Sequence, residues 1–324
     1  MKIFGESFAS AVPFRRTVLP INIDADLPAR AVLERENIFV MTEPRAASQE
    51  IRPLEIAIVN LMPTKVDTEI QLLRLLANTP LQINIHLVQM EGHVSKHTGR
   101  EHLERFYLSS DEVFTKRFDG MIITGAPVEQ LKFEQVDYWE PLCRLMDYAK
   151  KNVYSTLYIC WGAMAGLYHL YGINKHLLPQ KLSGIYYSRL IAPTEPLLRG
   201  FDDYFPVPTS RYTMIEPSEV EAVHSLQVLA KSKDTGLTIA KSVDNRSIFM
   251  TGHLEYDVDT LAKEYRRDVE RGLDIHLPMN YFPHNDPSQP VSSTWRSTAH
   301  LFYSNWLNYY VYQMTPYNLE DLSK

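Results

Sequence analysis

The sequence has only two cysteines, Cys143 and Cys160, and no long run of basic or apolar residues. Two cysteines cannot build a disulfide framework or, unaided, a zinc site, so no metal is expected. The net charge is −6, and without a basic patch neither nucleic acid nor an anionic membrane is an expected partner. No stretch approaches the ~18–20 apolar residues that span a bilayer. Glu6 and two early arginines make the N-terminus a poor fit to a signal peptide, so a cytoplasmic location is expected.

Several signatures of cofactor and metal enzymes are also missing. The chain contains no G-x-G-x-x-G after a strand, no G-x-x-x-x-G-K-[ST], no H-E-x-x-H, no C-x-x-C and no G-x-S-x-G. Dinucleotide-dependent redox chemistry, P-loop phosphoryl transfer and zinc hydrolysis therefore lack their usual patterns. No permanently bound cofactor is expected.

What is present is the pattern of an α/β protein. Of the 324 residues, 45% are apolar and 22% charged, which is typical of a globular chain with a large core. Residues 1–50 have weak periodicity and predict an irregular N-terminal arm, which leaves 51–324 as a single α/β domain. Apolar strand patterns and helical spacings alternate in that domain, and this alternation predicts a parallel sheet covered on both faces. The predicted strands are 54–61, 81–90, 121–124, 156–160 and 247–251, and the predicted helices include 66–78, 136–146 and 162–170.

Cys160, at the end of a predicted strand, is a candidate nucleophile. Residues 156–160 predict a buried strand that ends on Cys160, and the small residues Gly162 and Ala163 follow almost at once. This pattern favours a sharp turn into a helix, whose N-terminus stabilises a thiolate and whose free N–H groups can hold an oxyanion. Cys143 lies on the apolar face of a predicted helix and is interpreted as a core residue.

A histidine follows another strand end. Residues 247–251 predict a strand, and Gly252, His253 and Glu255 come directly after it. Because the carboxyl ends of parallel strands share one edge of the sheet, His253 can reach Cys160 as its base. Glu255 can then orient the imidazole and stabilise its cation. The alternative is a surface histidine with an unrelated acidic neighbour.

These residues, together with several longer stretches, resemble the homoserine O-acyltransferases of the MetA type. The resemblance extends from about residue 26 to residue 319. It implies the fold of class I glutamine amidotransferases, a flavodoxin-like, doubly wound, mostly parallel sheet with helices on both faces, and it implies a homodimer. The matching stretches are 36–42 (ENIFVMT), 60–65 (NLMPTK), 124–127 (TGAP), 160–161 (CW), 252–253 (GH), 255–256 (EY) and 305–310 (NWLNYY).

The resemblance also implies a role for each residue of the predicted triad. Cys160 matches the nucleophile that carries the acyl group as a thioester, His253 the general base and Glu255 the third member. The backbone amide of Trp161, at the turn after the nucleophile, is then expected to hold the oxyanion. Lys65 matches a lysine near the acyl-transfer site.

Four further positions match residues that bind or select substrates. Lys181, Ser210 and Arg267 match positions that bind the amino-acid acceptor, and a guanidinium can grip an α-carboxylate in a bidentate fork. Without the resemblance, the charged residues around Arg267 would indicate that it is one charge on a solvated helix. Glu129 matches the position that is glycine in succinyl-specific members and glutamate in acetyl-specific ones. Its carboxylate would repel a succinyl group, so acetyl-CoA is the expected co-substrate.

The chain departs from the family pattern at several positions that we expect to lie near the acceptor. Homoserine-using members usually carry histidines at three places where this chain has Thr209, Ser188 and Thr298, and a glutamate where it has Tyr187. We expect the bulk of Tyr187 to shorten the acceptor pocket, which favours L-serine over L-homoserine. One methylene is worth only ~1–3 kcal/mol, so few substitutions are needed. The prediction is ping-pong acetyl transfer to L-serine, giving O-acetyl-L-serine for cysteine biosynthesis.

The sequence is also compatible with other functions. The same mechanism with homoserine would serve methionine biosynthesis, and homoserine succinylation is a further alternative. A glutamine amidotransferase-type hydrolase shares the Cys…His-x-Glu pattern. An inactive binding homologue would explain the changed residues, although the triad itself is intact.

Overall fold

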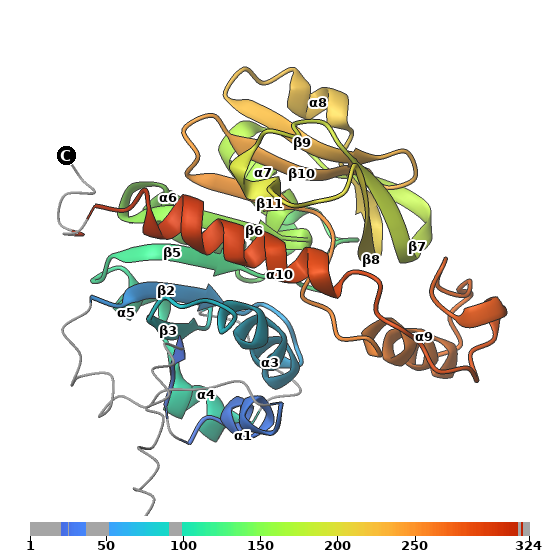
Figure 1. Cartoon of the computed structure of the whole chain (residues 1–324), viewed down its shortest axis with the longest axis horizontal. Coiled ribbons are helices and arrows are strands. Elements are labelled where there is room, and N and C mark those ends of the chain that lie inside the picture. Colours follow the sequence, from blue (N-terminus) through green and yellow to red (C-terminus); the bar gives the residue numbers. More distant parts are fainter. Residues whose placement is uncertain (1–20, 25, 37–51, 91–98, 317–318, 320–324) are drawn as a thin grey trace, which may run out of the picture.

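The computed structural model describes residues 21–24, 26–36, 52–90, 99–316 and 319 (Figure 1). Within these residues the strands form an 11-stranded sheet with the order β1-β3-β2-β5-β6-β11-β10-β9-β7-β8, and β4 pairs with β3. The strands are β1 (Ile21–Asn22), β2 (Leu54–Val59), β3 (Ile83–Val88), β4 (Tyr107–Leu108), β5 (Phe118–Ile123), β6 (Val153–Ile159), β7 (His176–Leu190), β8 (Tyr204–Met214), β9 (Leu226–Ser232), β10 (Gly236–Ser242) and β11 (Ser247–Met250).

The sheet has a parallel part and an antiparallel part, which meet at β11. From β1 to β11 all neighbours along this order pair in parallel. From β11 through β10, β9 and β7 to β8 all neighbours are antiparallel. The predicted mostly parallel sheet with helices on both faces is confirmed. The antiparallel extension was not predicted.

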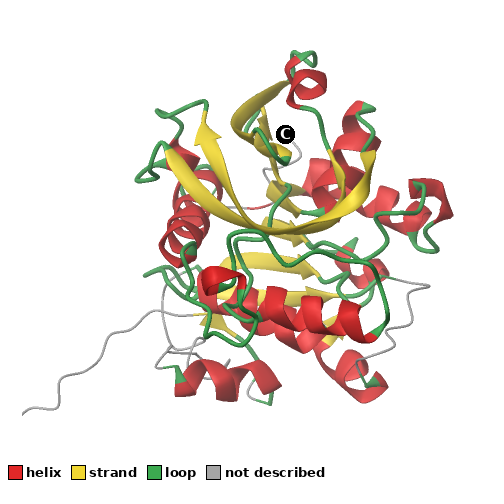
Figure 2. Cartoon of the chain, turned by 90° about the vertical axis from the view of Figure 1, so that its right-hand side faces the viewer, coloured by secondary structure: helices red, strands yellow, loops and turns green. Residues whose placement is uncertain are grey.

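Helices cover both faces of this strongly curved sheet (Figure 2). Each face has its own apolar core. One core receives residues from α1 (Pro28–Arg35), α3 (Lys65–Leu76), α9 (Thr260–Glu270), α10 (Arg296–Asn305) and the π-helix η4 (Trp306–Tyr312). The other receives α5 (Ser110–Val113), α6 (Trp139–Asn152), α7 (Trp161–Tyr171) and α8 (Pro217–Glu221). Helix α4 (Arg100–Phe106) precedes β4, and three 3₁₀ segments complete the described elements: η1 (Phe133–Gln135), η2 (Pro196–Leu198) and η3 (Pro283–Asn285). None of the helices in the described ranges has the length and apolarity needed to cross a bilayer.

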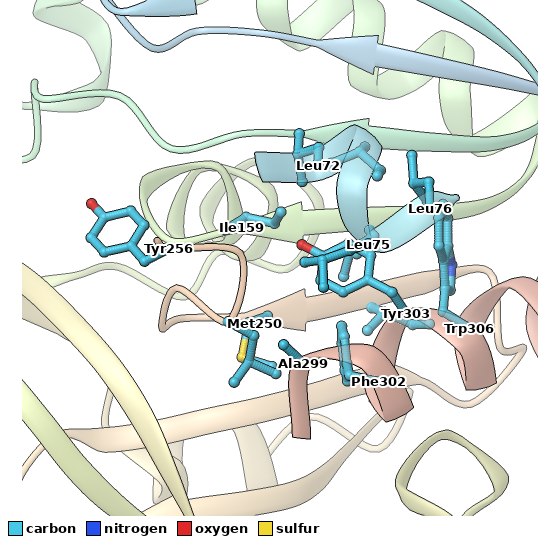
Figure 3. Close-up of a cluster of buried hydrophobic side chains, with 14 of the residues drawn as sticks. Leu72, Leu75, Leu76, Ile159, Met250, Tyr256, Ala299, Phe302, Tyr303 and Trp306 are labelled. Carbon is cyan, nitrogen blue, oxygen red and sulfur yellow. The ribbon is translucent and has the colours of Figure 1, made fainter. Parts of the chain in front are cut away.

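Strand β6 shows how the two cores are divided. Leu157 and Ile159 join the core beneath α3 and α10, whereas Tyr158 joins the other, because successive side chains of a strand point to opposite faces. Figure 3 shows Ile159 and Met250 together with leucines of α3 and aromatic side chains of the C-terminal helices. The indole N–H of Trp306 donates to Ser155 Oγ at 2.9 Å, which fixes the C-terminal segment on β6. The C-terminal segment is thus part of the core, to which α10 and η4 contribute buried aromatic side chains.

The N-terminal stretch contains regular structure where an irregular arm was expected. Strand β1 pairs with β3, and Ala29 and Leu33 of α1 are buried in the core that α3 shares. The matching stretch 36–42 lies outside the described residues, except for its first residue. The division into an arm and a single domain stays a prediction.

Gly162, in the first turn of α7, allows a close approach of this helix to β5. A Cβ at this position would lie 2.6 Å from the carbonyl oxygen of Thr124 and 2.7 Å from that of Ile123. Since these are backbone atoms, Gly162→Ala is expected to lower the free energy of unfolding by about 1–3 kcal/mol. Thermal unfolding measures this, with Gly99→Ala as the control because nothing lies within 4 Å of its Cβ. Equal melting temperatures for both variants would contradict the packing argument.

Candidate active site

Cys160 occupies a strained turn between β6 and α7. It is the N-cap of α7 with φ at 51°, a left-handed conformation that costs a residue with a side chain about 1–3 kcal/mol. Its backbone N–H donates to the carbonyl of Met250 at 2.7 Å, and its side chain is buried, with the residue only 7% exposed. The strand, turn and helix start lie where the sequence predicts them. Trp161 is the first residue of α7, so its backbone N–H has no partner within the helix.

The pairing of β6 with β11 brings the predicted nucleophile and base to one edge. Ile159 lies opposite Met250 in the parallel register, and His253 follows in the turn after β11. Gly125 marks how close the two side chains are. A Cβ on Gly125 would lie 3.8 Å from Sγ of Cys160 and 3.5 Å from Cε1 of His253. The glycine of the 124–127 stretch therefore provides the space in which the two groups meet.

Glu255 orients the imidazole of His253. Its Oε1 lies 2.6 Å from Nδ1, and both side chains are buried. Burial opposes a charge on the ring, but the Cys160 and Glu255 charges, with hydrogen bonds to both, raise the pKa of His253 well above its ordinary value. A carboxylate on Nδ1 leaves Nε2 for the thiol, which is the arrangement of a general base.

Strand β8 holds the turn that carries His253, a contact that the sequence does not predict. The N–H of His253 donates to the carbonyl of Pro208 at 2.8 Å. Arg211 is buried and donates to the carbonyl of Thr251 at 3.0 Å, two residues before the histidine. Its other hydrogen bonds go to the carbonyls of Thr213 and Thr235. This buried guanidinium ties β8 to the end of β11.

Lys65 lies at the start of α3, in a buried cluster beyond the end of β2. Its Nζ donates to the carbonyl of Asn60 at 2.5 Å, and burial lowers the pKa of Lys65 to about 8, with Glu69 counteracting. Glu69 accepts from Tyr107 at 2.6 Å and lies 2.9 Å from Nε2 of His102. Asn60 also donates to the Tyr107 hydroxyl. Among the described residues, no hydrogen bond joins Lys65 to the triad.

The predicted acceptor residues meet at one acidic pair on α9. Ser210 donates to Glu264, and Nζ of Lys181 lies 3.9 Å from the same carboxylate and 2.7 Å from Asp268. Arg267 also binds Asp268, at 2.7 Å, with its own side chain 48% exposed. Burial works against the charge of Asp268, yet the hydrogen bonds from Lys181 and Arg267 hold its pKa below the ordinary value. Glu264 and Asp268 were missed because only the tertiary fold brings α9 to β7 and β8.

Glu129 faces this cluster from the loop after β5. Burial raises the pKa of Glu129, the charge of Glu264 acts in the same direction, and Lys181 and the backbone of Tyr212 oppose the shift. Glu129 therefore lies close enough to the predicted acceptor residues for their charges to affect its pKa. Which substrate each of these residues binds stays a prediction.

The positions that depart from the family pattern do not form one pocket wall. Tyr187 is 53% exposed, so the expectation that its bulk shortens the acceptor pocket is not supported. The adjacent Ser188 is buried against Thr238, at 2.8 Å between the hydroxyls. Thr209 is buried next to Ser210, and Thr298 is buried in α10. Of the four, Thr209 is the one adjacent in sequence to a predicted acceptor residue.

No metal cluster accompanies these residues. Within the ranges that the structure describes, no three His, Cys, Asp or Glu side chains are grouped so that they can hold an ion.

Comparison with known proteins decides the family. The family described as homoserine O-succinyltransferase matches residues 20–317. The chain belongs to this family. Relatives named homoserine O-acetyltransferase are 54% identical in Petrotoga mobilis and 57% identical in Desulfovibrio desulfuricans, each over 306 residues. These alignments cover 94% of this chain and 99% and 98% of the relatives.

A solved structure agrees with this assignment at the level of the fold. A glutamine amidotransferase from Thermotoga maritima superimposes with a TM-score of 0.50 at 11% identity, covering 79% of this chain and 98% of that one. The class I glutamine amidotransferase-like fold of this acyltransferase family member is therefore confirmed. The enzyme class, acyl transfer, follows from the family.

Proposed function

We propose that this protein transfers an acetyl group from acetyl-CoA to the hydroxyl of L-homoserine, through a thioester on Cys160. The choice of homoserine as acceptor rests on the relatives named homoserine O-acetyltransferase, which align with this chain over almost their whole length. This choice replaces the preference for serine, since the exposed Tyr187 removes the argument for a shorter pocket. The product, O-acetyl-L-homoserine, would serve methionine biosynthesis.

The geometry supports a two-step reaction. The Cys160 thiolate, whose proton His253 holds, attacks the thioester carbonyl; the carbon–sulfur bond to CoA breaks, and CoA leaves with that proton as the acetyl-enzyme forms. Backbone N–H groups at the Cys160 turn hold the oxyanion, with Trp161 at the start of α7 and Gly125 beside the sulfur as the positions that can supply them. His253, now neutral, accepts the proton of the acceptor hydroxyl as that oxygen attacks the acetyl group, and the Cys160 sulfur leaves as the thiolate.

The acceptor would bind between α9 and strands β7 and β8. Lys181 and Arg267 are cations that can hold an α-carboxylate, and Glu264 is an anion that can hold an α-ammonium group. In the structure Lys181 and Arg267 pair with Asp268, and Ser210 donates a hydrogen bond to Glu264. A zwitterionic amino acid can replace those contacts with its own charges.

One assay tests this function. CoA release is followed with acetyl-CoA or succinyl-CoA as donor and homoserine or serine as acceptor. We expect acetyl-CoA with homoserine to give the highest kcat/KM. A preference for serine would revive the second candidate, for which the buried Thr209 beside Ser210 is the specific observation. Release of ammonia from glutamine, without CoA release, would indicate an amidotransferase instead.

Glu129 is expected to select the donor. Glu129→Gly should raise kcat/KM for succinyl-CoA relative to acetyl-CoA by about 10- to 100-fold, because juxtaposed like charges cost several kcal/mol. Glu129→Gln is the matched control, since it removes the charge and keeps the volume. An unchanged donor ratio in both variants would contradict this role.

Lys65 is expected to set an alkaline limit on activity. Because its pKa is lowered to about 8, the ammonium group is lost as the pH rises through that value, well below the ordinary pKa of a lysine. If the charge assists acyl transfer, kcat/KM falls above about pH 8. Lys65→Arg should shift that fall to higher pH, whereas Lys65→Met should be slow throughout. An alkaline limb that is identical in Lys65→Arg would exclude Lys65 as its source.

The proposal also includes an oligomeric state and a cellular location. The resemblance implies a homodimer, which light scattering at several protein concentrations would test. A cytoplasmic location fits a biosynthetic acyltransferase that uses acetyl-CoA, and fractionation of the source cells would test it.

A further inference from the structure

Tyr256 lies directly on the predicted general base. Its ring stacks on the imidazole of His253 with 4.1 Å between the ring centres and 18° between the planes. Both side chains are buried. In Figure 3, Tyr256 lies at one end of the apolar cluster that contains Ile159 and Met250, with its hydroxyl directed away from the cluster. The tyrosine ring therefore limits how far the imidazole can tilt.

The hydroxyl of the same residue reaches the acceptor cluster. It donates to Oε1 of Glu264 at 2.9 Å, while Oε2 of that carboxylate accepts from Ser210 and lies 3.9 Å from Nζ of Lys181. The backbone of Tyr256 is also fixed, because its carbonyl accepts from the indole N–H of Trp295 at 3.0 Å. One side chain thus touches both the base and the carboxylate at the centre of the acceptor site.

We propose that Tyr256 is a positioning residue that couples occupation of the acceptor site to the orientation of His253. The coupling rests on the function proposed above. An acceptor that binds beside Lys181, Ser210 and Glu264 changes the hydrogen bonds of Glu264, and the hydroxyl of Tyr256 follows that carboxylate. The stacked ring then carries the shift to the imidazole that must take the acceptor's proton. Such coupling acts on the second half-reaction more than on the first.

The two half-reactions can be measured separately. With acetyl-CoA alone, the enzyme releases one burst of CoA as Cys160 is acetylated; with acceptor added, it turns over. Tyr256→Phe keeps the ring and loses the bond to Glu264, so we expect the KM for the acceptor to rise about tenfold, with a far smaller change in the burst rate. Tyr256→Leu also removes the stacked ring and should slow both steps.

Tyr281→Phe is the matched control. The Tyr281 hydroxyl bonds the carbonyl of Val258 at 2.5 Å and the N–H of Ala262 at 3.2 Å, so it fixes the same loop to the same helix. It contacts neither His253 nor Glu264 through these bonds. We expect this variant to lower the melting temperature without raising the acceptor KM.

Two results would overturn the coupling. One is an unchanged acceptor KM in Tyr256→Phe, and the other is the same KM increase in Tyr281→Phe, which would indicate general loosening of the loop. If the wild-type enzyme shows a normal burst and normal turnover, either of these results contradicts the coupling but not the proposed function. A wild-type enzyme without any burst from acetyl-CoA would overturn the proposed function, and the coupling with it.

Discussion

Replacing Cys160 with alanine is expected to abolish acetyl transfer, with a loss in kcat of at least about 10⁴-fold. The proposed reaction passes through a thioester on this sulfur, and no other cysteine adjoins the triad. Cys143, the other cysteine, is on α6, where burial and the surrounding acidic residues raise its pKa to about 12. A thiol with so high a pKa is a poor nucleophile at neutral pH.

Trapping of the acetyl group locates the nucleophile. Wild-type protein incubated with radiolabelled acetyl-CoA and no acceptor should retain the label on the peptide that contains Cys160. Cys143→Ala should retain it equally, and Cys160→Ala should not. Turnover by Cys160→Ala would indicate direct transfer between the substrates, and failure of the wild type to trap label would support an inactive homologue.

Glu255→Gln is expected to lower kcat by about 10³- to 10⁴-fold, although the change is small in volume. The carboxylate accepts a hydrogen bond from Nδ1–H of His253 and so leaves Nε2 free to act as a base. A glutamine amide can instead donate to Nδ1, which places the ring proton on Nε2, the nitrogen that faces the thiol. The imidazole is then held in the tautomer that cannot accept a proton.

The pH dependence distinguishes this tautomer effect from simple loss of a contact. The Glu255 charge raises the pKa of His253, so the neutral variant should move the acid limb of kcat to lower pH. Glu255→Ala, which cannot donate to Nδ1, is expected to lose less activity than Glu255→Gln. Equal losses in the two variants, or a loss below tenfold in Glu255→Gln, would contradict the orienting role.

The parallel half of the fold could be predicted from sequence because its strands are buried on both faces. Mostly apolar runs such as 54–61 and 247–251 are typical of strands that are covered on both faces. Strand β7 carries no such run: it contains Pro179, Gln180 and Lys181, much of it is exposed, and its pairing with β8 shifts register between Leu177 and Leu182. Its local pattern resembles that of a loop.

The residues of the site also fall into those that the sequence predicts and those that it does not. Cys160, His253 and Glu255 could be proposed because each follows a strand end, and strand ends of a parallel sheet share an edge. Arg211, Tyr256 and Glu264 could not, because nothing in their local sequence indicates what lies opposite them. Tyr187 was expected to shorten the acceptor pocket, but it is 53% exposed, and the exposure of a residue depends on tertiary packing that its local sequence does not show.

The pairing of β6 with β11 has a consequence for how the chain is made. Strand β11 lies between β6 and β10, and the whole antiparallel part, from β7 to β10, comes before it in the sequence. During synthesis, Cys160 leaves the ribosome long before its base, and until β11 inserts, the edge of β6 remains open to pairing with another chain. A nascent or truncated chain that stops before β11 therefore exposes this edge and has no base. Among the described strands, the last one in the sequence is thus followed directly by the two residues that complete the proposed triad.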